Sequence, residues 1–219
     1  IGEVARAGQQ FQYYGAECLR MAGEKIPSTR PGFQVEITRE PIGIIGIISP
    51  WNFPIAIPAW KAAPALMCGN AVILKPASLT PASAIALTEI IDKQDLPTGL
   101  FNLVIGSGSG IGNQIATNPD IPAITFTGSV EVGKSLYTDA SPLLKKMQME
   151  MGSKNPLVVL DDADLSTAIS CAANGAYGGT GQKCTASSRI IVQEGIYKKF
   201  IEGLTEHISK IKVGHALEE

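Results

Sequence analysis

Apolar residues form short runs at five places along the chain, at 42–48, 71–74, 101–105, 124–126 and 157–160. Polar residues do not alternate with apolar ones inside these runs. This pattern is typical of strands that are covered on both faces, as in the parallel sheets of α/β proteins. The runs therefore predict the strands of a parallel sheet.

Segments with apolar residues at helical spacing lie between these runs and predict helices over 56–67, 82–92, 130–138 and 165–176. Thr80 is the predicted cap of the second of these helices, with Pro81 in its first turn. Strands that alternate with helices indicate a doubly wound α/β fold. The sequence therefore predicts a Rossmann-like, mostly parallel architecture.

The first forty residues follow other patterns. Apolar residues recur at helical spacing over 1–22, which predicts an opening amphipathic helix. After a turn at 27–32, apolar and polar residues alternate over 34–40, as in a half-buried strand of a hairpin or sheet extension. We expect this segment to be an edge at which copies of the chain associate.

Composition and charge exclude two classes of partner. With 45% apolar and 17% charged residues the chain is globular, and its net charge of −2 gives no basic surface for nucleic acid. The longest strongly apolar run, 42–48, is far shorter than the roughly 20 residues of a membrane-spanning helix. We expect a soluble, cytoplasmic protein that acts on a small molecule and binds neither nucleic acid nor membrane.

The four cysteines lie far apart and form no C-x-x-C pair, so we expect no metal site and no disulfide framework. Cys18, Cys68 and Cys171 have apolar neighbours on helical patterns, and we expect them to be buried as small apolar side chains. Cys184 instead ends the glycine-rich segment GGTGQKC at 178–184. A neighbouring lysine and exposed backbone amides favour the thiolate, the form that attacks a carbonyl carbon.

A Cys/His hydrolase would need an imidazole beside this thiol. The only histidines, His207 and His215, follow it in a Lys-rich helical tail that we expect to be solvated. The candidate for proton transfer is Glu150, which stands between methionines at the end of a strand-like run. Burial there would suit this carboxylate to general-base work. A carboxylate that only caps backbone amides at a strand end is the alternative.

Two glycine-containing segments are candidates for phosphate binding. The segment 106–112 follows a predicted strand and contains Gly108, but a structural turn is the favoured interpretation because no acidic residue follows at the dinucleotide-binding distance. In 126–129 and Gly133, a strand leads through Gly128 and Ser129 into a helix. Backbone amides, the Ser129 hydroxyl and the positive end of that helix fit a phosphate.

The segment PWNFP at 50–54 directly follows the run at 42–48, at the carboxyl end of a predicted strand, where open α/β sheets bind ligands. Asn52 is held between two prolines and two aromatic residues, which makes its side-chain amide a candidate oxyanion donor. A packed turn is the alternative for this pentapeptide.

Taken together, these segments resemble the aldehyde dehydrogenase family. Its PWNFP, KPA, FTGS, E-(L/M)-G-(G/S)-K and G-Q-x-C elements appear in this order between residues 50 and 184. The resemblance extends over the whole chain and implies that 1–152 is part of a cofactor-binding domain, with an oligomerisation arm at about 23–41. It implies that 153–219 begins a catalytic α/β domain, that the chain is an internal segment, and that the full protein is a homodimer or homotetramer.

The resemblance also implies roles for individual residues. Cys184 would attack the aldehyde and form a thiohemiacetal whose oxyanion Asn52 stabilises, and Glu150 would activate the water that hydrolyses the later thioester. Lys61 and Lys154 match lysines near this carboxylate. The residues implied to line the NAD(P) site are Trp51, Lys75, Ser78, Gly108, Gly128, Ser129 and Gly133.

Two departures from the family pattern are informative. Ser78 stands where many NAD-preferring members have a glutamate, and its lack of charge would tolerate or favour the 2′-phosphate of NADP. The segments 150–156 and 179–189 look most like those of 2,5-dioxopentanoate (α-ketoglutaric semialdehyde) dehydrogenases, with succinate-semialdehyde dehydrogenases next. Oxidation of a semialdehyde to its carboxylate is therefore expected.

Two alternatives remain open at this point. A CoA-acylating dehydrogenase is disfavoured because that branch of the family typically lacks the acid found at Glu150. An incomplete segment that binds nucleotide or pairs with other subunits without turnover is the other alternative, because motifs of the catalytic domain beyond this chain would complete the pocket.

Overall fold

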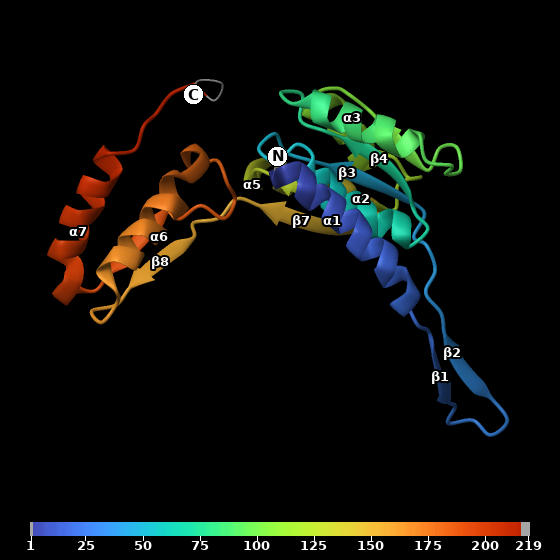
Figure 1. The fold of residues 1–219 in the computed structure, drawn as a ribbon. Coiled ribbons are helices and arrows are strands. Elements are labelled where there is room, and N and C mark those ends of the chain that lie inside the picture. Colours follow the sequence, from blue (N-terminus) through green and yellow to red (C-terminus); the bar gives the residue numbers. More distant parts are fainter. Residues whose placement is uncertain (1, 216–219) are drawn as a thin grey trace. The chain divides into compact units, whose positions relative to one another are not determined.

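The computed structural model describes residues 2–215 and divides into two compact units. Unit 1 extends to Met151, and unit 2 begins at Gly152. Each unit has its own apolar core, and each is described by itself (Figure 1).

Unit 1 contains a five-stranded sheet in which all neighbouring strands are parallel, in the order β5-β4-β3-β6-β7. The chain adds strands outward from β3 to β5, then returns to the other side of β3 with β6 and β7. This reversal is the switch point of a doubly wound sheet, which confirms the predicted fold class. The strands are β3 (Ile44–Ile48), β4 (Ala71–Lys75), β5 (Phe101–Leu103), β6 (Ala123–Gly128) and β7 (Lys146–Met151).

Helices cover both faces of this sheet. One face packs against α2 and α3, with α1 lying over α2 (Figure 1). The other face packs against α4 and α5, through Ile115 and Leu136. The helices are α1 (Gly2–Glu17), α2 (Ala56–Met67), α3 (Pro81–Asp92), α4 (Asn113–Thr117) and α5 (Val130–Ala140), with short turns η1 (Cys18–Arg20) and η3 (Ser141–Leu143) and the π-helical η2 (Gly108–Gly112).

Two positions in unit 1 are fixed by backbone and packing requirements. Gly46 lies on central strand β3, where an added Cβ would come 2.4 Å from a methyl carbon of Ile115 on α4. Lys145 is buried and its ammonium donates to Ile115 O (3.0 Å) and Asn118 O (2.5 Å), at the end of α4. Helix α4 therefore packs directly on the middle of the sheet and is closed by a lysine at its carbonyl end.

The predicted hairpin is present as β1 (Glu24–Pro27) and β2 (Gln34–Ile37), which pair antiparallel. The expectation that its second strand is half-buried is wrong for this chain, because every residue of both strands is exposed. The two strands form an isolated ribbon, so neither face has a second layer to cover it (Figure 1). Apolar Val35 and Ile37 are therefore left in solvent.

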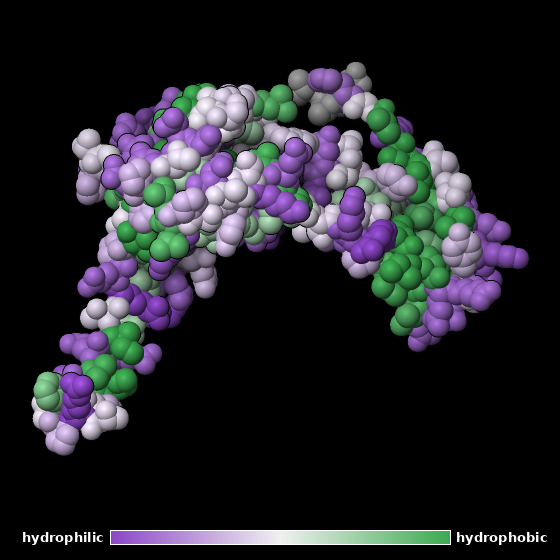
Figure 2. All heavy atoms as spheres, turned by 180° about the vertical axis from the view of Figure 1, so that it is seen from behind, coloured by the Kyte–Doolittle hydropathy of each residue, from purple (hydrophilic) through white to green (hydrophobic). Residues whose placement is uncertain are grey.

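Unit 2 is smaller and consists of two parallel strands and two helices. β8 (Pro156–Val159) pairs with β9 (Arg189–Val192), and α6 (Leu165–Tyr177) and α7 (Glu194–Ser209) pack on one face of the pair around Phe200. The other face is uncovered: Val158, Leu160 and Ile191 are 60%, 54% and 53% exposed. Figure 2 shows the apolar patch of unit 2. The run at 157–160 is thus a strand, but it is wrong that it is covered on both faces.

Two other predictions about side chains are wrong. Cys18 and Cys171 are exposed and Cys68 is only half-buried, because each lies on the outer part of its helix or turn. The Thr80 hydroxyl does not cap α3 but donates to Trp51 O at 3.5 Å. Among the described residues, no helix is long and apolar enough to cross a membrane, and no group of His, Cys, Asp and Glu side chains could hold a metal ion.

Candidate active site

The candidate residues of unit 1 follow the carboxyl ends of adjacent strands. β3 ends at Ile48, which is in register with Lys75 at the end of β4 and with Phe126 near the end of β6. Glu150, near the end of β7, pairs with Thr127. Because the strands are parallel, these ends lie along one edge of the sheet, at the switch point where open α/β sheets bind ligands.

Lys61 of α2 reaches this sheet and is held by polar groups of two strands. Its ammonium donates to Thr125 Oγ1 at 2.7 Å and to Gln148 Oε1 at 2.8 Å, with Phe126 O at 3.4 Å. Thr125 and Gln148 are direct partners across β6 and β7, and their side chains are also hydrogen-bonded to each other. The lysine is therefore held by three hydrogen-bond acceptors on the α2 side of the sheet.

Burial changes the protonation of this lysine. Desolvation lowers the pKa of Lys61 to about 8, and the negative charge of nearby Glu150 partly opposes this by raising it. A lysine amine with a pKa near neutrality can exchange a proton at physiological pH. Lys61 thus combines a fixed position with an adjustable charge.

Glu150 faces the same side of β7 as Gln148, because successive side chains of a strand point to opposite faces. Met147, Met149 and Met151 take the inner face and pack on the core formed with α5. The expectation that Glu150 is buried among its methionine neighbours is therefore wrong: its side chain is exposed.

Asn52 lies half-buried in the loop between β3 and α2, and neighbouring Trp51 is exposed. This loop is tied to α1 at two points. A single carboxylate oxygen of Glu3 accepts hydrogen bonds from Ile55 N (2.8 Å) and Ala56 N (2.9 Å), at the start of α2. These amides belong to the first turn of α2, where Ile55 provides no side-chain cap. Glu3 therefore caps this helix from a distant part of the chain.

Aromatic contacts form the second tie. The Arg6 guanidinium lies 5.8 Å from the centroid of the Trp60 ring, and the Trp60 ring centroid is 6.4 Å from that of Phe53, next to Asn52. A cation over an aromatic face is attractive at this distance. The loop that carries Asn52 thus rests between helix α1 and the first turns of α2.

Lys75 and Ser78 follow β4, on the other side of β3 from β6. Lys75 is buried, its ammonium donates to Pro76 O at 2.9 Å, and desolvation lowers its pKa. The Ser78 hydroxyl donates to Gly106 O at 3.0 Å, which joins the loops after β4 and β5. The structure therefore brings these two residues together with the glycine-rich segment that begins at Gly106.

That segment is a strand-to-helix turn, as favoured from the sequence. Ser107 Oγ accepts from Gly110 N at 2.9 Å and so caps η2. An added Cβ at Gly106 would come 2.6 Å from Ile111, whereas at Gly108 it would meet nothing within 4 Å. Packing within the chain therefore explains Gly106 but leaves the surface at Gly108 open.

The FTGS segment enters α5 through Ser129, whose hydroxyl accepts from Val132 N at 3.3 Å. An added Cβ at Gly128 would come 2.5 Å from the Phe126 ring, and one at Gly133 would come 2.5 Å from the Met151 sulfur. Gly133 therefore permits close packing of α5 on β7, and Gly128 leaves room for the Phe126 ring of its own strand. The positive end of α5 and Ser129 remain at the carboxyl edge of the sheet, where they fit a phosphate group.

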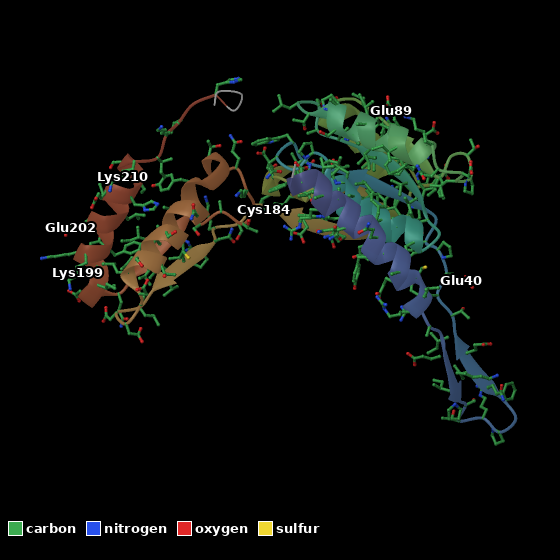
Figure 3. The ribbon with its side chains drawn as sticks, viewed as in Figure 1. Glu40, Glu89, Cys184, Lys199, Glu202 and Lys210 are labelled. Atoms are coloured by element: carbon green, nitrogen blue, oxygen red, sulfur yellow. The ribbon has the colours of Figure 1, made fainter. Side chains whose placement is uncertain are left out.

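Cys184 belongs to unit 2, in the segment between α6 and β9, and its side chain is exposed (Figure 3). The preceding turn η4 (Gly178–Gly181) has positive φ at Gly179 (63°), Thr180 (58°) and Gly181 (69°). Left-handed backbone suits glycine but is unfavourable for a β-branched threonine. Ala186 N donates to Lys183 O at 3.1 Å, so Cys184 lies inside a tight turn.

The Lys-rich tail that was expected to be solvated forms helix α7 of unit 2. Lys199 and Glu202 lie on α7 and Lys210 follows its end (Figure 3), and all three are exposed. Lys210 also pairs with Glu206 at 2.6 Å. His207 lies on α7 with its side chain exposed, and Lys154, which precedes β8, is exposed as well.

Sequence reasoning missed the residues that hold others in place. Glu3, Thr125 and Gln148 have no motif of their own, and only the fold brings them to α2 and Lys61. One signal was present for Gln148: polar and apolar residues alternate in KMQMEM at 146–151, which places it on the same face as Glu150. No local signal links Glu3 to a helix that begins more than fifty residues later.

Known proteins are similar to this chain over its whole length. The whole chain, residues 1–219, matches the family described as "Aldehyde dehydrogenase family". It is 46% identical over 218 residues to an alpha-ketoglutaric semialdehyde dehydrogenase of Bacillus subtilis, covering 100% of this chain and 45% of that protein. It is 41% identical over 219 residues to a 2,5-dioxopentanoate dehydrogenase of Saccharolobus solfataricus, covering 99% and 46%.

Solved structures are similar over the same extent. A crystal structure of an aldehyde dehydrogenase from Brucella melitensis biovar abortus superimposes with a TM-score of 0.95 at 38% identity, covering 99% of this chain and 45% of that one. A betaine aldehyde dehydrogenase of Staphylococcus aureus in complex with NAD+ gives 0.97 at 35% identity, covering 99% and 43%. The chain thus spans less than half the length of the proteins that it matches.

Proposed function

Because the chain belongs to the aldehyde dehydrogenase family, we propose that it carries the nucleophile of an enzyme that oxidises an aldehyde to a carboxylate with NAD+ or NADP+. The observation that carries this proposal is the position of Asn52, Ser129 and Glu150 at the carboxyl ends of three neighbouring strands, along one edge of the sheet. Unit 1 is the cofactor-binding part in this proposal, and unit 2 is the beginning of the catalytic part.

The reaction begins when the Cys184 thiolate forms a bond to the aldehyde carbon, whose oxygen becomes an oxyanion. The Asn52 side-chain amide and the Cys184 N–H donate hydrogen bonds to this oxygen, where the charge develops. Bound NAD(P)+ supplies the acceptor for the hydride that leaves the same carbon. A thioester on Cys184 remains.

Glu150 then takes a proton from a water molecule while that water attacks the thioester carbon. The carbon–sulfur bond breaks, the carboxylic acid leaves, and the thiolate of Cys184 is restored. The exposed position of Glu150 on β7 supports this role, since a general base needs access to water. Lys61 lies on the same side of the sheet, where the negative charge of Glu150 raises the pKa of the lysine, and Lys154 is proposed to lie near the same carboxylate.

The chemistry of the donors in unit 1 fits a dinucleotide. We assign the pyrophosphate to Ser129 and the start of α5, next to Gly128 and Gly133, and the adenosine ribose to Lys75. Trp51 and the open surface at Gly108 line the same edge. Ser78 carries no negative charge to repel a 2′-phosphate, so NADP is tolerated and either cofactor is accepted in this proposal.

A semialdehyde is the proposed substrate. The relatives from Bacillus subtilis and Saccharolobus solfataricus are named for α-ketoglutaric semialdehyde and 2,5-dioxopentanoate, and 46% identity over the whole chain to the first supports the same substrate class here. The hairpin arm, with its exposed Val35 and Ile37, is proposed to join copies of the full protein into a homodimer or homotetramer.

The test is formation of NADH or NADPH from 2,5-dioxopentanoate and succinate semialdehyde, with Cys184→Ala as the control. We expect cofactor reduction without added CoA, and none in Cys184→Ala. Cofactor binding without any reduction would favour the alternative of a segment without turnover. Product formation only with CoA would instead favour an acylating dehydrogenase, which the presence of Glu150 disfavours.

A further inference from the structure

Asn155, which no step above uses, contacts the backbone on both sides of Thr185. Its side-chain amide nitrogen donates to Cys184 O at 2.6 Å and to Ala186 O at 3.1 Å. A primary amide has two N–H groups, so one asparagine can serve two carbonyls at once. Asn155 is therefore hydrogen-bonded to the turn at 183–186, which contains Cys184. This pair of hydrogen bonds is called the grip below.

The asparagine is itself firmly held. The backbone carbonyl oxygen of Asn155 accepts hydrogen bonds from Ser188 N at 3.0 Å and from Arg189 N at 3.3 Å. The Arg189 guanidinium donates to the preceding carbonyl, Lys154 O, at 3.1 Å and 2.8 Å. Asn155 directly precedes β8, and β8 pairs with β9 from Arg189 onward. The grip on the turn is thus anchored at the start of the two-stranded sheet.

These bonds fix the conformation of Cys184. The peptide plane before it is held because Lys183 O accepts from Ala186 N at 3.1 Å. The peptide plane after it is held because Cys184 O accepts from Asn155. Since peptide units are planar, holding the carbonyl of each plane restricts the two soft backbone torsions of Cys184. The direction of its N–H and of its Cα–Cβ bond is then set.

We propose that Asn155 is a positioning residue that holds the Cys184 backbone in the orientation needed for attack and for oxyanion binding. The inference rests on the proposed function for its catalytic meaning, but the grip itself is a property of unit 2. Reactions of this kind depend on sub-ångström placement of the nucleophile, so release of the turn lowers the rate of attack.

The first experiment needs no turnover. In a chain with Cys18, Cys68 and Cys171 replaced by serine, Cys184 is labelled with a trifluoromethyl ketone reagent and observed by ¹⁹F NMR. We expect the resonance to narrow and shift in Asn155→Ala and most in Asn155→Asp, whose carboxylate cannot donate and repels both carbonyls. Asn174→Ala is the matched control, because Asn174 lies on α6 of the same unit and its side-chain amide donates to Ser170 Oγ at 3.4 Å.

Amide hydrogen exchange separates a local effect from loss of the fold. The Ser188 and Arg189 amides bond the backbone of Asn155, so their protection survives replacement of its side chain if only the turn is released. An unchanged ¹⁹F resonance in Asn155→Asp would overturn the proposal. Loss of protection at Ser188 and Arg189 in both variants would also overturn it, because Asn155 would then be needed for the sheet rather than for the turn.

The second experiment connects the grip to catalysis. We expect Asn155→Ala to lower kcat roughly 10-fold with little change in KM for the cofactor, a smaller loss than the roughly 100-fold or more caused by removing an oxyanion donor. A released turn with unchanged kcat would sink the catalytic part of the inference. An active enzyme is required here, so absence of turnover in the unsubstituted protein would count against the proposed function and leave the NMR result to decide the grip.

Discussion

Lys61 gives a prediction at the scale of one residue. Its pKa of about 8 in the folded protein lies below the value of 10.5 for an unburied lysine. Between these values the unfolded chain binds a proton that the folded chain does not, so this group makes stability rise with pH from about 8 to 10.5. Replacement by methionine removes this contribution, and the free energy of unfolding of Lys61→Met should rise less over the same range.

The measurement is urea unfolding of both proteins between pH 7 and 10.5, with Lys93→Met as the control because Lys93 is exposed at the end of α3. Parallel pH dependence of Lys61→Met and the unsubstituted protein would contradict the prediction. The comparison uses slopes, since loss of the bonds to Thr125 and Gln148 shifts the stability of the variant at every pH.

Individual side chains were harder to predict than strands. The chain order of Asn52, Ser129 and Glu150 indicated their edge of the sheet because parallel strands end together. The alternation of polar and apolar residues along β7 places the Glu150 side chain on the exposed face. We predicted burial instead because its two neighbours in sequence are methionines. Cys18 and Cys171 were misplaced because apolar neighbours in sequence do not decide which way a helical side chain points.

Helix α2 gives a prediction at the scale of an element. Truncating Glu3 to alanine leaves the amides of Ile55 and Ala56 without this acceptor, and loss of a helix cap costs about 1 kcal/mol. The loop that carries Trp51 is expected to loosen, so Trp51 fluorescence in a Trp60→Phe background should become more accessible to acrylamide.

Glu3→Gln should recover most of the loss, because its amide oxygen still accepts both hydrogen bonds. Glu17→Ala is the matched control: Glu17 is a glutamate of the same helix, and it pairs with Arg20 instead of α2. Equal quenching and equal stability in Glu3→Ala and Glu17→Ala would show that the cap does not hold the loop.

Packing of α4 on β3 gives a second prediction for an element. In Gly46→Ala the new methyl would collide with the branched side chain of Ile115, which has no flexible end to move away. Overpacking of a core costs about 1–3 kcal/mol, and thermal unfolding of unit 1 should shift to lower temperature. Gly108→Ala is the control, because open space surrounds that position, and an equal loss in both variants would argue against the close contact.

Most elements of unit 1 follow from periodicity alone. The predicted helix 56–67 matches α2, and the run at 71–74 differs from β4 by one residue. Thr80 was mispredicted because a hydroxyl at a cap position has another acceptor when a loop such as that of Trp51 comes close. In unit 2, strand β9 at 189–192 was missed, because a run of four residues gives little periodic signal.

The uncovered face of unit 2 gives a prediction for the whole molecule. Val158 and Ile191 are exposed side by side on the paired strands β8 and β9, Leu160 just after β8 is exposed too, and apolar patches of this kind favour association. Val158→Lys combined with Ile191→Lys should lower the sedimentation coefficient relative to that of the unsubstituted chain, because association through this face is lost. Val213→Lys, at an exposed position outside the strands, adds a similar charge and should leave association unchanged.

Sedimentation that is the same in the double variant and in Val213→Lys would exclude this face as the cause of association. The sequence could not reveal the bare face, because the run at 157–160 has the same composition as the strands that unit 1 covers on both sides. The pattern of residues in a strand shows which of its faces are apolar. What covers those faces depends on layers that lie elsewhere in the chain or in a partner.

The alternation along β7 has a consequence for chemical durability. Three of the five methionines of the chain lie on the inner face of this edge strand, at positions 147, 149 and 151. Conversion of a buried thioether to its sulfoxide replaces an apolar side chain with a polar one and weakens the packing beneath the strand. An oxidant that reaches the chain can therefore act in two ways. It can oxidise the thiol of Cys184 directly, or it can oxidise the methionines that pack beneath β7 and so displace Glu150. Only a methionine sulfoxide reductase would reverse the second kind of damage.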